Sequence, residues 1–305
     1  MAALTPQFFQ LLEAEEKDIF FKTYEMQDLL YPQLFDVKTS TKAYEDRIRI
    51  SRLGTFATKA EGTPISYDDP VQGQQVRTVH QTYGLGFRIT MEMMQDDQFG
   101  VMSQMSGDLA ESAADHQERL AWGLVNDGFT GNTYTGLEDD TLFTSTHTLL
   151  KGSNATVNRT NILSPAVALS QTGIEDILTL AMQAESDEGR FIKVQPQTLV
   201  IHPEEAHNAY VLLNTDQKPG SADNDRSTVV SSRSGLTPLV VPYLSSTSNW
   251  FVFGDKSKHT LCYNNRMGLE FDSSVDSETR DMKFTSVYRA SVMWSEWRSA
   301  WGSQA

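Results

Sequence analysis

The sequence lacks three features that would assign it quickly to a class of protein. Only one of its 305 residues is a cysteine, Cys262, which excludes an internal disulfide and a multi-cysteine zinc site. No apolar run approaches the ~20 residues that a membrane-spanning helix needs. The N-terminal residues show no cationic segment followed by an apolar one, so we expect no export by a secretory signal and no membrane span. A lone cysteine fits folding in a reducing cytoplasm.

Basic residues are scarce as well. The chain has 25 Lys and Arg against 40 Asp and Glu, a formal net charge of −15. Residues 1–150 hold 23 acidic and 11 basic side chains, whereas 151–305 hold 17 and 14. Tight binding of nucleic acid needs cations that displace counterions from phosphate, so this balance predicts at most weak, nonspecific contact with DNA.

The residues that are present predict a folded protein. The apolar fraction is 39%, and the length allows one large or two modest domains. Thr5 and Pro6 are typical of a helix start, and we expect an amphipathic helix that ends near Pro32. The alternating residues of 46–53 and 79–89 then predict two long strands. With the polar, turn-rich stretch 59–75 between them, they suggest an extended β-hairpin.

A helical period replaces the alternation between Phe99 and Asn126. At ~1.5 Å per residue this helix would be about 40 Å long, and it would stop at Asn126-Asp127-Gly128. The neighbouring sequence offers it no equally long partner. A long hairpin and an unpartnered long helix favour a subunit that buries these elements on identical neighbours.

The second half predicts a compact α/β module and a return to strands. Residues 130–170 suggest irregular connections, and Thr172–Glu175 has the spacing of a capping box. Short elements follow, namely a strand at Thr198–Ile201, a helix from Pro203 to Leu213, a polar loop at 216–235, a strand at Trp250–Phe253 and antiparallel strands after Cys262. The expected fold class is α+β.

Motifs for catalysis are weak. His202, Glu205 and His207 invite a metal-dependent hydrolase, but zincins need histidines four residues apart on one helix, and here the spacing is five with Pro203 between them. Gly84-Leu85-Gly86 lacks the third glycine of a dinucleotide-binding loop. We therefore expect no enzyme, no cofactor and no metal site, with the hydrolase as the less favoured alternative.

Several short motifs, taken in order, carry a resemblance to a known family. They are Asn126–Phe129, Leu142–His147, Leu199–Pro203, Trp250–Asp255, Arg266–Leu269 and Arg289. In this order the chain resembles major capsid proteins of tailed bacteriophages with the Hong-Kong-phage-type capsid fold, and it is most similar to Mu-like major head subunits. An encapsulin-like nanocompartment shell protein, which shares the fold, is the closest alternative.

The resemblance implies a division of the chain. Residues 1–43 would form an N-terminal arm, 44–90 the extended hairpin loop, 91–169 the long spine helix with the peripheral domain, 170–255 the axial domain and 256–305 the return strands of the peripheral domain. The loop at Asp216–Gly235 would lie near a symmetry axis.

The resemblance also implies a function. Hexamers and pentamers of this chain would close into an icosahedral shell around double-stranded phage DNA, in a virion assembled in the bacterial host cytoplasm. The arm is too short to hold a fused scaffold, so a separate scaffolding protein is implied, together with a portal and decoration proteins as further partners. Some relatives cross-link neighbouring subunits through a loop lysine, but no partner for Lys59 can be assigned here.

The charges themselves suggest an interface between subunits. Residues 42–59 have a net charge of +3, whereas residues 91–120 have −6. We expect the cationic base of one loop to lie across the acidic helix of a neighbouring subunit, because complementary charges fix register. The interface candidates are Arg47, Arg49, Arg52, Lys59, Tyr67, Asp97, Asp108, Glu111 and Asp115.

Overall fold

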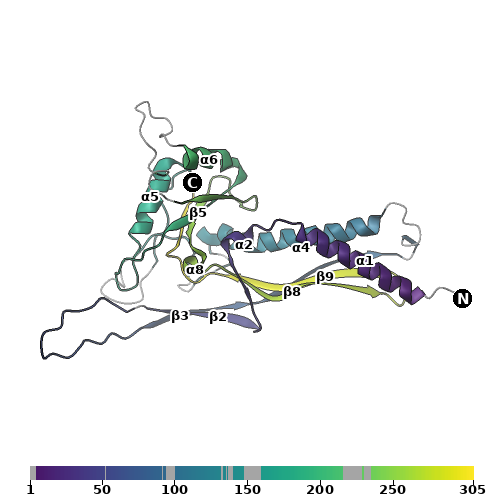
Figure 1. Cartoon of the computed structure of the whole chain (residues 1–305), viewed down its shortest axis with the longest axis horizontal. Coiled ribbons are helices and arrows are strands. Elements are labelled where there is room, and N and C mark those ends of the chain that lie inside the picture. Colours follow the sequence, from purple (N-terminus) through teal and green to yellow (C-terminus); the bar gives the residue numbers. More distant parts are fainter. Residues whose placement is uncertain are drawn as a thin grey trace.

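The computed structural model describes residues 5–51, 53–90, 92–93, 100–131, 133–134, 136, 140–147, 159–215, 229 and 235–305, with the backbone alone for 5–12. Within these residues the chain is a mixed α+β protein with three sheets. Figure 1 shows an elongated body of helices on long strands, a second group of helices and strands at one end, and a loop that projects beyond both.

A four-stranded sheet with the order β1-β8-β9-β4 forms the base of the elongated body. β9 pairs antiparallel with both β8 and β4, whereas β1 joins β8 in parallel. The strands are β1 (Asp36–Thr39), β4 (Gln81–Ile89), β8 (Cys262–Val275) and β9 (Met282–Met293). The antiparallel strands predicted after Cys262 are confirmed.

The predicted hairpin partner is wrong. β2 (Tyr44–Ile50) pairs not with β4 but with β3 (Gln72–Val79), which begins inside the stretch predicted as a turn. The chain changes sheets at His80, whose buried imidazole lies 3.2 Å from Ser40 Oγ and 2.9 Å from Ser291 Oγ. Alternation in a sequence predicts which face of a strand is buried, but it does not identify the neighbouring strand. Residues between 51 and 71 form the connection.

Two long helices cover the main sheet. α1 (Thr5–Glu25) and α4 (Val101–Asn126) lie side by side on β8 and β9, as Figure 1 shows. α4 stops at the predicted Asn126-Asp127-Gly128, where a 3-10 turn, η1 (Asp127–Phe129), follows. α4 is not unpartnered as predicted, because its apolar stripe packs on α1 and on the sheet. α1 also ends earlier than predicted, since Pro32 lies in the first turn of a separate helix, α2 (Tyr31–Leu34).

The second group of elements contains another four-stranded sheet, with the order β10-β7-β5-β6. Its strands are β5 (Pro196–Ile201), β6 (Thr237–Val240), β7 (Trp250–Gly254) and β10 (Ala300–Ser303), and the helices and turns beside them are α5 (Gln171–Met182), η2 (Pro203–Glu205), α6 (Ala206–Asn214) and α8 (Lys256–His259). The strands at 198–201 and 250–253 and the helix after Pro203 are confirmed. The N-cap of α5 is Ser170, whose hydroxyl accepts from Gly173 N, and not the predicted Thr172.

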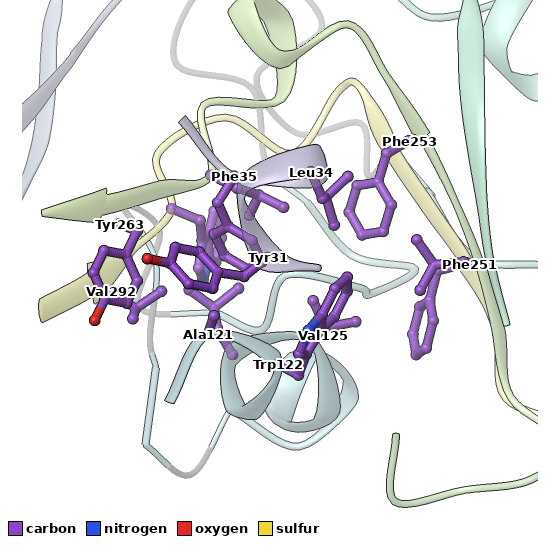
Figure 2. Close-up of a cluster of buried hydrophobic side chains, with 14 of the residues drawn as sticks. Tyr31, Leu34, Phe35, Ala121, Trp122, Val125, Phe251, Phe253, Tyr263 and Val292 are labelled. Atoms are coloured by element: carbon purple, nitrogen blue, oxygen red, sulfur yellow. The ribbon is translucent and has the colours of Figure 1, made fainter. Parts of the chain in front are cut away.

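The last strand crosses between the two groups. β10 pairs with β7, in the sheet formed mostly from residues 196–254, although the strands that precede it in sequence, β8 and β9, belong to the main sheet. The central hydrophobic cluster lies at this junction. In Figure 2, Tyr31 and Phe35 pack over Trp122 of α4, with Phe251 and Phe253 of β7 on the far side. The two groups are therefore packed through a shared core.

The surface of the chain is too large for a compact monomer. A globular protein of 34.2 kDa is expected to expose about 12,900 Å². This chain exposes 17,389 Å². The elongated body and the projecting loop contribute to this surface (Figure 1). Such a shape leaves extended faces for other molecules to cover.

Candidate assembly surfaces

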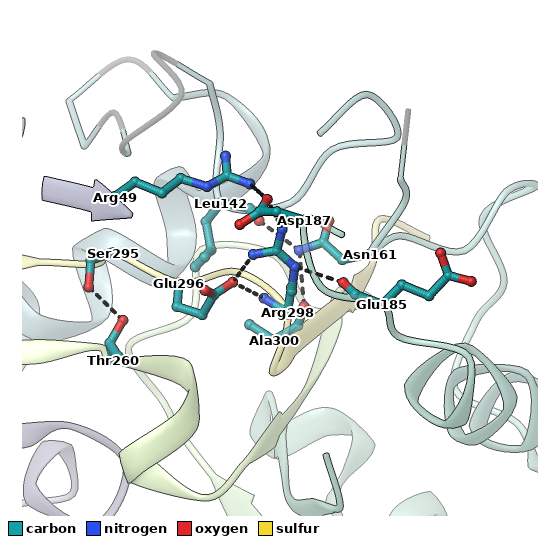
Figure 3. A network of polar contacts seen from close by, with 10 residues as sticks. All are labelled: Arg49, Leu142, Asn161, Glu185, Asp187, Thr260, Ser295, Glu296, Arg298 and Ala300. Atoms are coloured by element: carbon teal, nitrogen blue, oxygen red, sulfur yellow. Dashed lines mark hydrogen bonds and ion pairs between the residues drawn. The ribbon is translucent and has the colours of Figure 1, made fainter. Parts of the chain in front are cut away.

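A buried ion cluster fixes the base of the loop. Asp187 lies in the turn between α5 and β5. One of its carboxylate oxygens forms salt bridges with Arg49 of β2 at 2.6 Å and with Arg298 at 2.8 Å. The side chains of Arg49, Asp187 and Arg298 are 8%, 6% and 5% exposed. Arg298 also donates to the Glu296 carboxylate and to the Glu185 carbonyl, as Figure 3 shows. This cluster joins the loop, the second sheet group and the C-terminal segment.

Further bonds hold the two limbs of the loop on that turn. Gly54 N donates to the Asp68 carboxylate at 2.7 Å, which ties the outgoing limb to the returning one. The Gly54 carbonyl accepts from Arg190 Nη1 at 3.4 Å. The loop thus leaves the body in a defined direction.

Beyond this base the loop carries large side chains that contact little. Phe56 is 106% exposed and Tyr67 is 92% exposed, relative to an extended reference. Lys59 is exposed near the tip, and Ile65 is exposed on the returning limb. Arg52, also predicted at the interface, lies outside the described residues. A loop that presents aromatic rings to water is typical of an interaction surface.

The cations predicted at the loop base have different positions. Arg49 does not face a neighbour, because the buried cluster above accounts for its guanidinium. Arg47 is half-buried and donates toward Cys262 Sγ at 3.6 Å. Among the described cations of the prediction, Lys59 is the exposed one.

The acidic helix is only partly an acidic surface. Asp108 and Glu111 are exposed on α4, and Asp115 forms a salt bridge with Arg119 at 2.6 Å. Asp97 lies outside the described residues.

Glu118 contributed to the predicted charge of this face, but the structure contradicts that assignment. It is 3% exposed and accepts from Leu30 N, Tyr31 N and Trp122 Nε1. Its spacing of four residues from Trp122 places it on the buried stripe, which the sequence could have indicated. Burial raises the pKa of this carboxyl, although the three donors oppose the shift.

A groove runs between α4 and β4. Its larger compartment has a volume of about 390 Å³, and its smaller one about 210 Å³. Leu85 and Leu109 line both. At one end the Tyr83 ring packs against His116 at a tilt of 52°, and His116 also contacts Tyr288. Because β4 is an outer strand of its sheet, the groove opens at the edge of the body.

The candidate metal residues have local roles. His202 caps η2, with its Nδ1 accepting from Glu204 N at 3.3 Å, and Glu205 accepts from Asn208. Across the described part of the chain, no group of three or more His, Cys, Asp or Glu side chains is placed to hold a metal ion. Of the described helices, none combines the length and apolar character of a membrane span.

Solved structures with the same architecture include capsids and a virus-like particle. The capsid of cyanophage P-SCSP1u matches with a TM-score of 0.60 at 12% identity, over 90% of this chain and 88% of that one. The capsid of a native GTA particle matches with a TM-score of 0.59 at 11% identity, over 90% of this chain and 89% of that one. A virus-like particle from Pyrococcus furiosus matches with a TM-score of 0.53 at 10% identity, over 95% of this chain and 98% of that one. These likenesses define the fold as the Hong-Kong-phage-type capsid fold, as the sequence resemblance implied.

The family follows from the sequence itself. A model of the family described as "Phage capsid protein" matches residues 73–302. The chain belongs to this family and is a capsid shell protein. No curated protein matches it. The narrower likeness to Mu-like head subunits stays a prediction.

Proposed function

We propose that this chain is the major head subunit whose hexamers and pentamers close into an icosahedral shell around double-stranded DNA, and that it has no catalytic role. The observation that carries the proposal is the surface excess, 17,389 Å² against about 12,900 Å² for a compact monomer. The exposed rings of the loop belong to that surface. Closed assemblies of one chain cover such extended faces symmetrically.

The division into arm, extended loop, spine helix, peripheral and axial domains belongs to this proposal. It is supported by the projecting loop, by the long helix α4 on β9 and β4, and by the separate sheet of β5, β6, β7 and β10. The extended loop of one subunit would lie across α4 of the next. Lys59 would supply the positive charge, and Asp108 and Glu111 the negative charge, of that contact.

The partners and place of assembly follow from the same proposal. A separate scaffolding protein, a portal and decoration proteins would complete the head in the host cytoplasm. The procapsid of bacteriophage JBD30, similar at a TM-score of 0.54 and 14% identity over 99% of this chain and 76% of that one, shows that this fold occurs in a precursor shell. The match to the phage family favours a virion over an encapsulin-like compartment. The net charge of −15 favours weak, nonspecific contact with packaged DNA.

Self-association of the purified protein tests the proposal. We expect capsomer rings or closed particles by size-exclusion chromatography and negative-stain electron microscopy, and fewer of them as salt screens the charges. A monomer that persists at high concentration, with phage lysate added to supply scaffold, would contradict the proposal.

A charge swap tests the loop contact itself. Lys59→Glu and Asp108→Lys should each raise the concentration needed for assembly, and the double variant should restore it, because the opposite charges are paired again. Arg49 is unsuitable for this test, since reversing its charge would disrupt the buried cluster. Equal assembly by all three variants would remove Lys59 and Asp108 from the interface.

A further inference from the structure

The side chains that line the groove between α4 and β4 do not fill it. Tyr83, Leu85 and Phe87 alternate along β4, so their side chains lie on the face toward α4. Tyr83 is covered by His116, and Phe87 packs into the cluster with Met105. Leu85 between them is 56% exposed.

The reason for this gap is the size of the residues opposite. Ser112 and Ala113 of α4 line the larger compartment, and neither side chain reaches across it. The hollow is bounded by aromatic rings at one end and by Leu109 along its length. Its volume of about 390 Å³ accommodates an aromatic ring.

The backbone of β4 adds a second feature. Its inner edge pairs with β9 along nine residues, and in the order β1-β8-β9-β4 its other edge faces outward. An outer strand with few charges is suited to accept another extended segment. A ligand for this groove should therefore be extended, with an apolar ring on one side.

The loop contains such a segment. Residues 53–59 are described without helix or strand and expose Leu53, Phe56 and Lys59. This limb has no acidic residue, whereas the returning limb carries Asp68 and Asp69 between Pro64 and Pro70. Because the acidic side chain of Asp108 lines the smaller compartment, the outgoing limb has the complementary charge.

We propose that Phe56 of one copy inserts its ring into the larger compartment of the α4–β4 groove of a second copy, with residues 53–59 lying along the outer edge of β4. This inference rests on the proposed function. Figure 1 shows the loop projecting away from β4 of its own chain, so a second copy must supply the ring.

The spacing of the two contacts is consistent. Three residues of strand from Phe56 to Lys59 span about 10 Å. Along α4 the five residues from Ala113 back to Asp108 span about 7.5 Å. The flexible lysine side chain covers the difference. Residues three apart in a strand point to opposite faces, so Lys59 lies outside the compartment that holds the ring and approaches Asp108 only through its long side chain.

A disulfide between two different chains tests the geometry. Chains with Phe56→Cys are mixed with chains with Ala113→Cys, assembled and oxidised, and then run on a denaturing gel without reductant. We expect a covalent dimer that forms at least five-fold faster than in the matched mixture of Tyr67→Cys with Ala113→Cys chains. The native Cys262 is buried, and the wild type gives the background. Equal or absent cross-linking in both mixtures overturns the inference.

Substitutions test the energetic role of the ring. Phe56→Ala and the groove-filling Ala113→Met should each raise the concentration needed for assembly about ten-fold. Particles that form normally with Phe56→Ala would sink this inference alone. If the wild type forms no oligomer under any condition, the proposed function fails and this inference fails with it.

Discussion

The packed body and the projecting loop of this protein use the same kinds of residue in opposite ways. In the body, Trp122 and Phe253 are fully buried, and even the carboxylates of Glu118 and Asp187 are enclosed and paired. In the loop, Phe56 and Tyr67 are almost fully exposed. The difference shows that the body buries its aromatic side chains within the single chain, whereas the loop does not.

The largest effect should come from breaking the cluster that joins the two regions. Asp187→Leu leaves Arg49 and Arg298 buried without their shared carboxylate, so we expect the free energy of unfolding to fall by about 3–5 kcal/mol. Denaturant unfolding measures it. The matched control is Asp46→Leu, which removes the carboxylate partner of the exposed Arg77 and should cost under about 1 kcal/mol. Similar losses in both variants would show that the cluster adds nothing to stability.

A pH effect of comparable size should arise in the body. Burial lowers the pKa of His259 to about 4, and its ring packs edge-on against Phe253. Below the usual histidine pKa of ~6.5 the imidazole is protonated in the unfolded chain but stays neutral in the folded one. The free energy of unfolding therefore falls by about 3 kcal/mol between pH 6.5 and 4.

Urea midpoints across this pH range measure the effect. His259→Leu should flatten the profile, because the titrating group is gone. A slope that persists in His259→Leu would assign the pH dependence to other groups.

Glycine-to-alanine substitutions should have smaller effects on stability, and these effects should differ between the body and the loop. A Cβ at Gly86 would lie 2.6 Å from the Phe284 carbonyl oxygen across the β4–β9 pair, so Gly86→Ala should cost about 1–3 kcal/mol. Gly62, in the loop, has nothing within 4 Å but a φ of +78°. There, Gly62→Ala should cost about 1 kcal/mol through the backbone alone. Thermal melts compare the two, and a greater loss at Gly62 would reverse the comparison.

The smallest effect on stability should accompany the largest effect on assembly. Replacing residues 55–67 by Gly-Ser-Gly closes the loop where Gly54 already bonds to Asp68. We expect the free energy of unfolding to change by under about 1 kcal/mol, because the removed residues bury little and loop entropy depends weakly on length. Particles should be lost in electron micrographs. A large drop in stability would mean that the loop supports the body.

Much of the architecture could be predicted from local patterns. The period of the helix ending at Asn126, the cap-like start at Thr5 and the alternation after Cys262 all depend on neighbours in the sequence. These local patterns do not predict which strands pair or which distant side chains meet. Nothing local indicates that the strand after His80 joins β9, or that Asp187 meets Arg49 and Arg298 from segments 138 and 111 residues away.

The α+β class, the long helix, the acidic balance and the resemblance to phage capsid proteins can all be recognised without a structure. These properties are set by composition and by short-range periodicity. Which charged side chains are exposed on the surface becomes clear from the tertiary structure alone. Arg49 and Glu118 are enclosed while Lys59 and Asp108 remain exposed, because burial depends on contacts between distant segments. The same packing leaves Phe56 exposed and a hollow beside Leu85, and the proposed contact between copies rests on these two features.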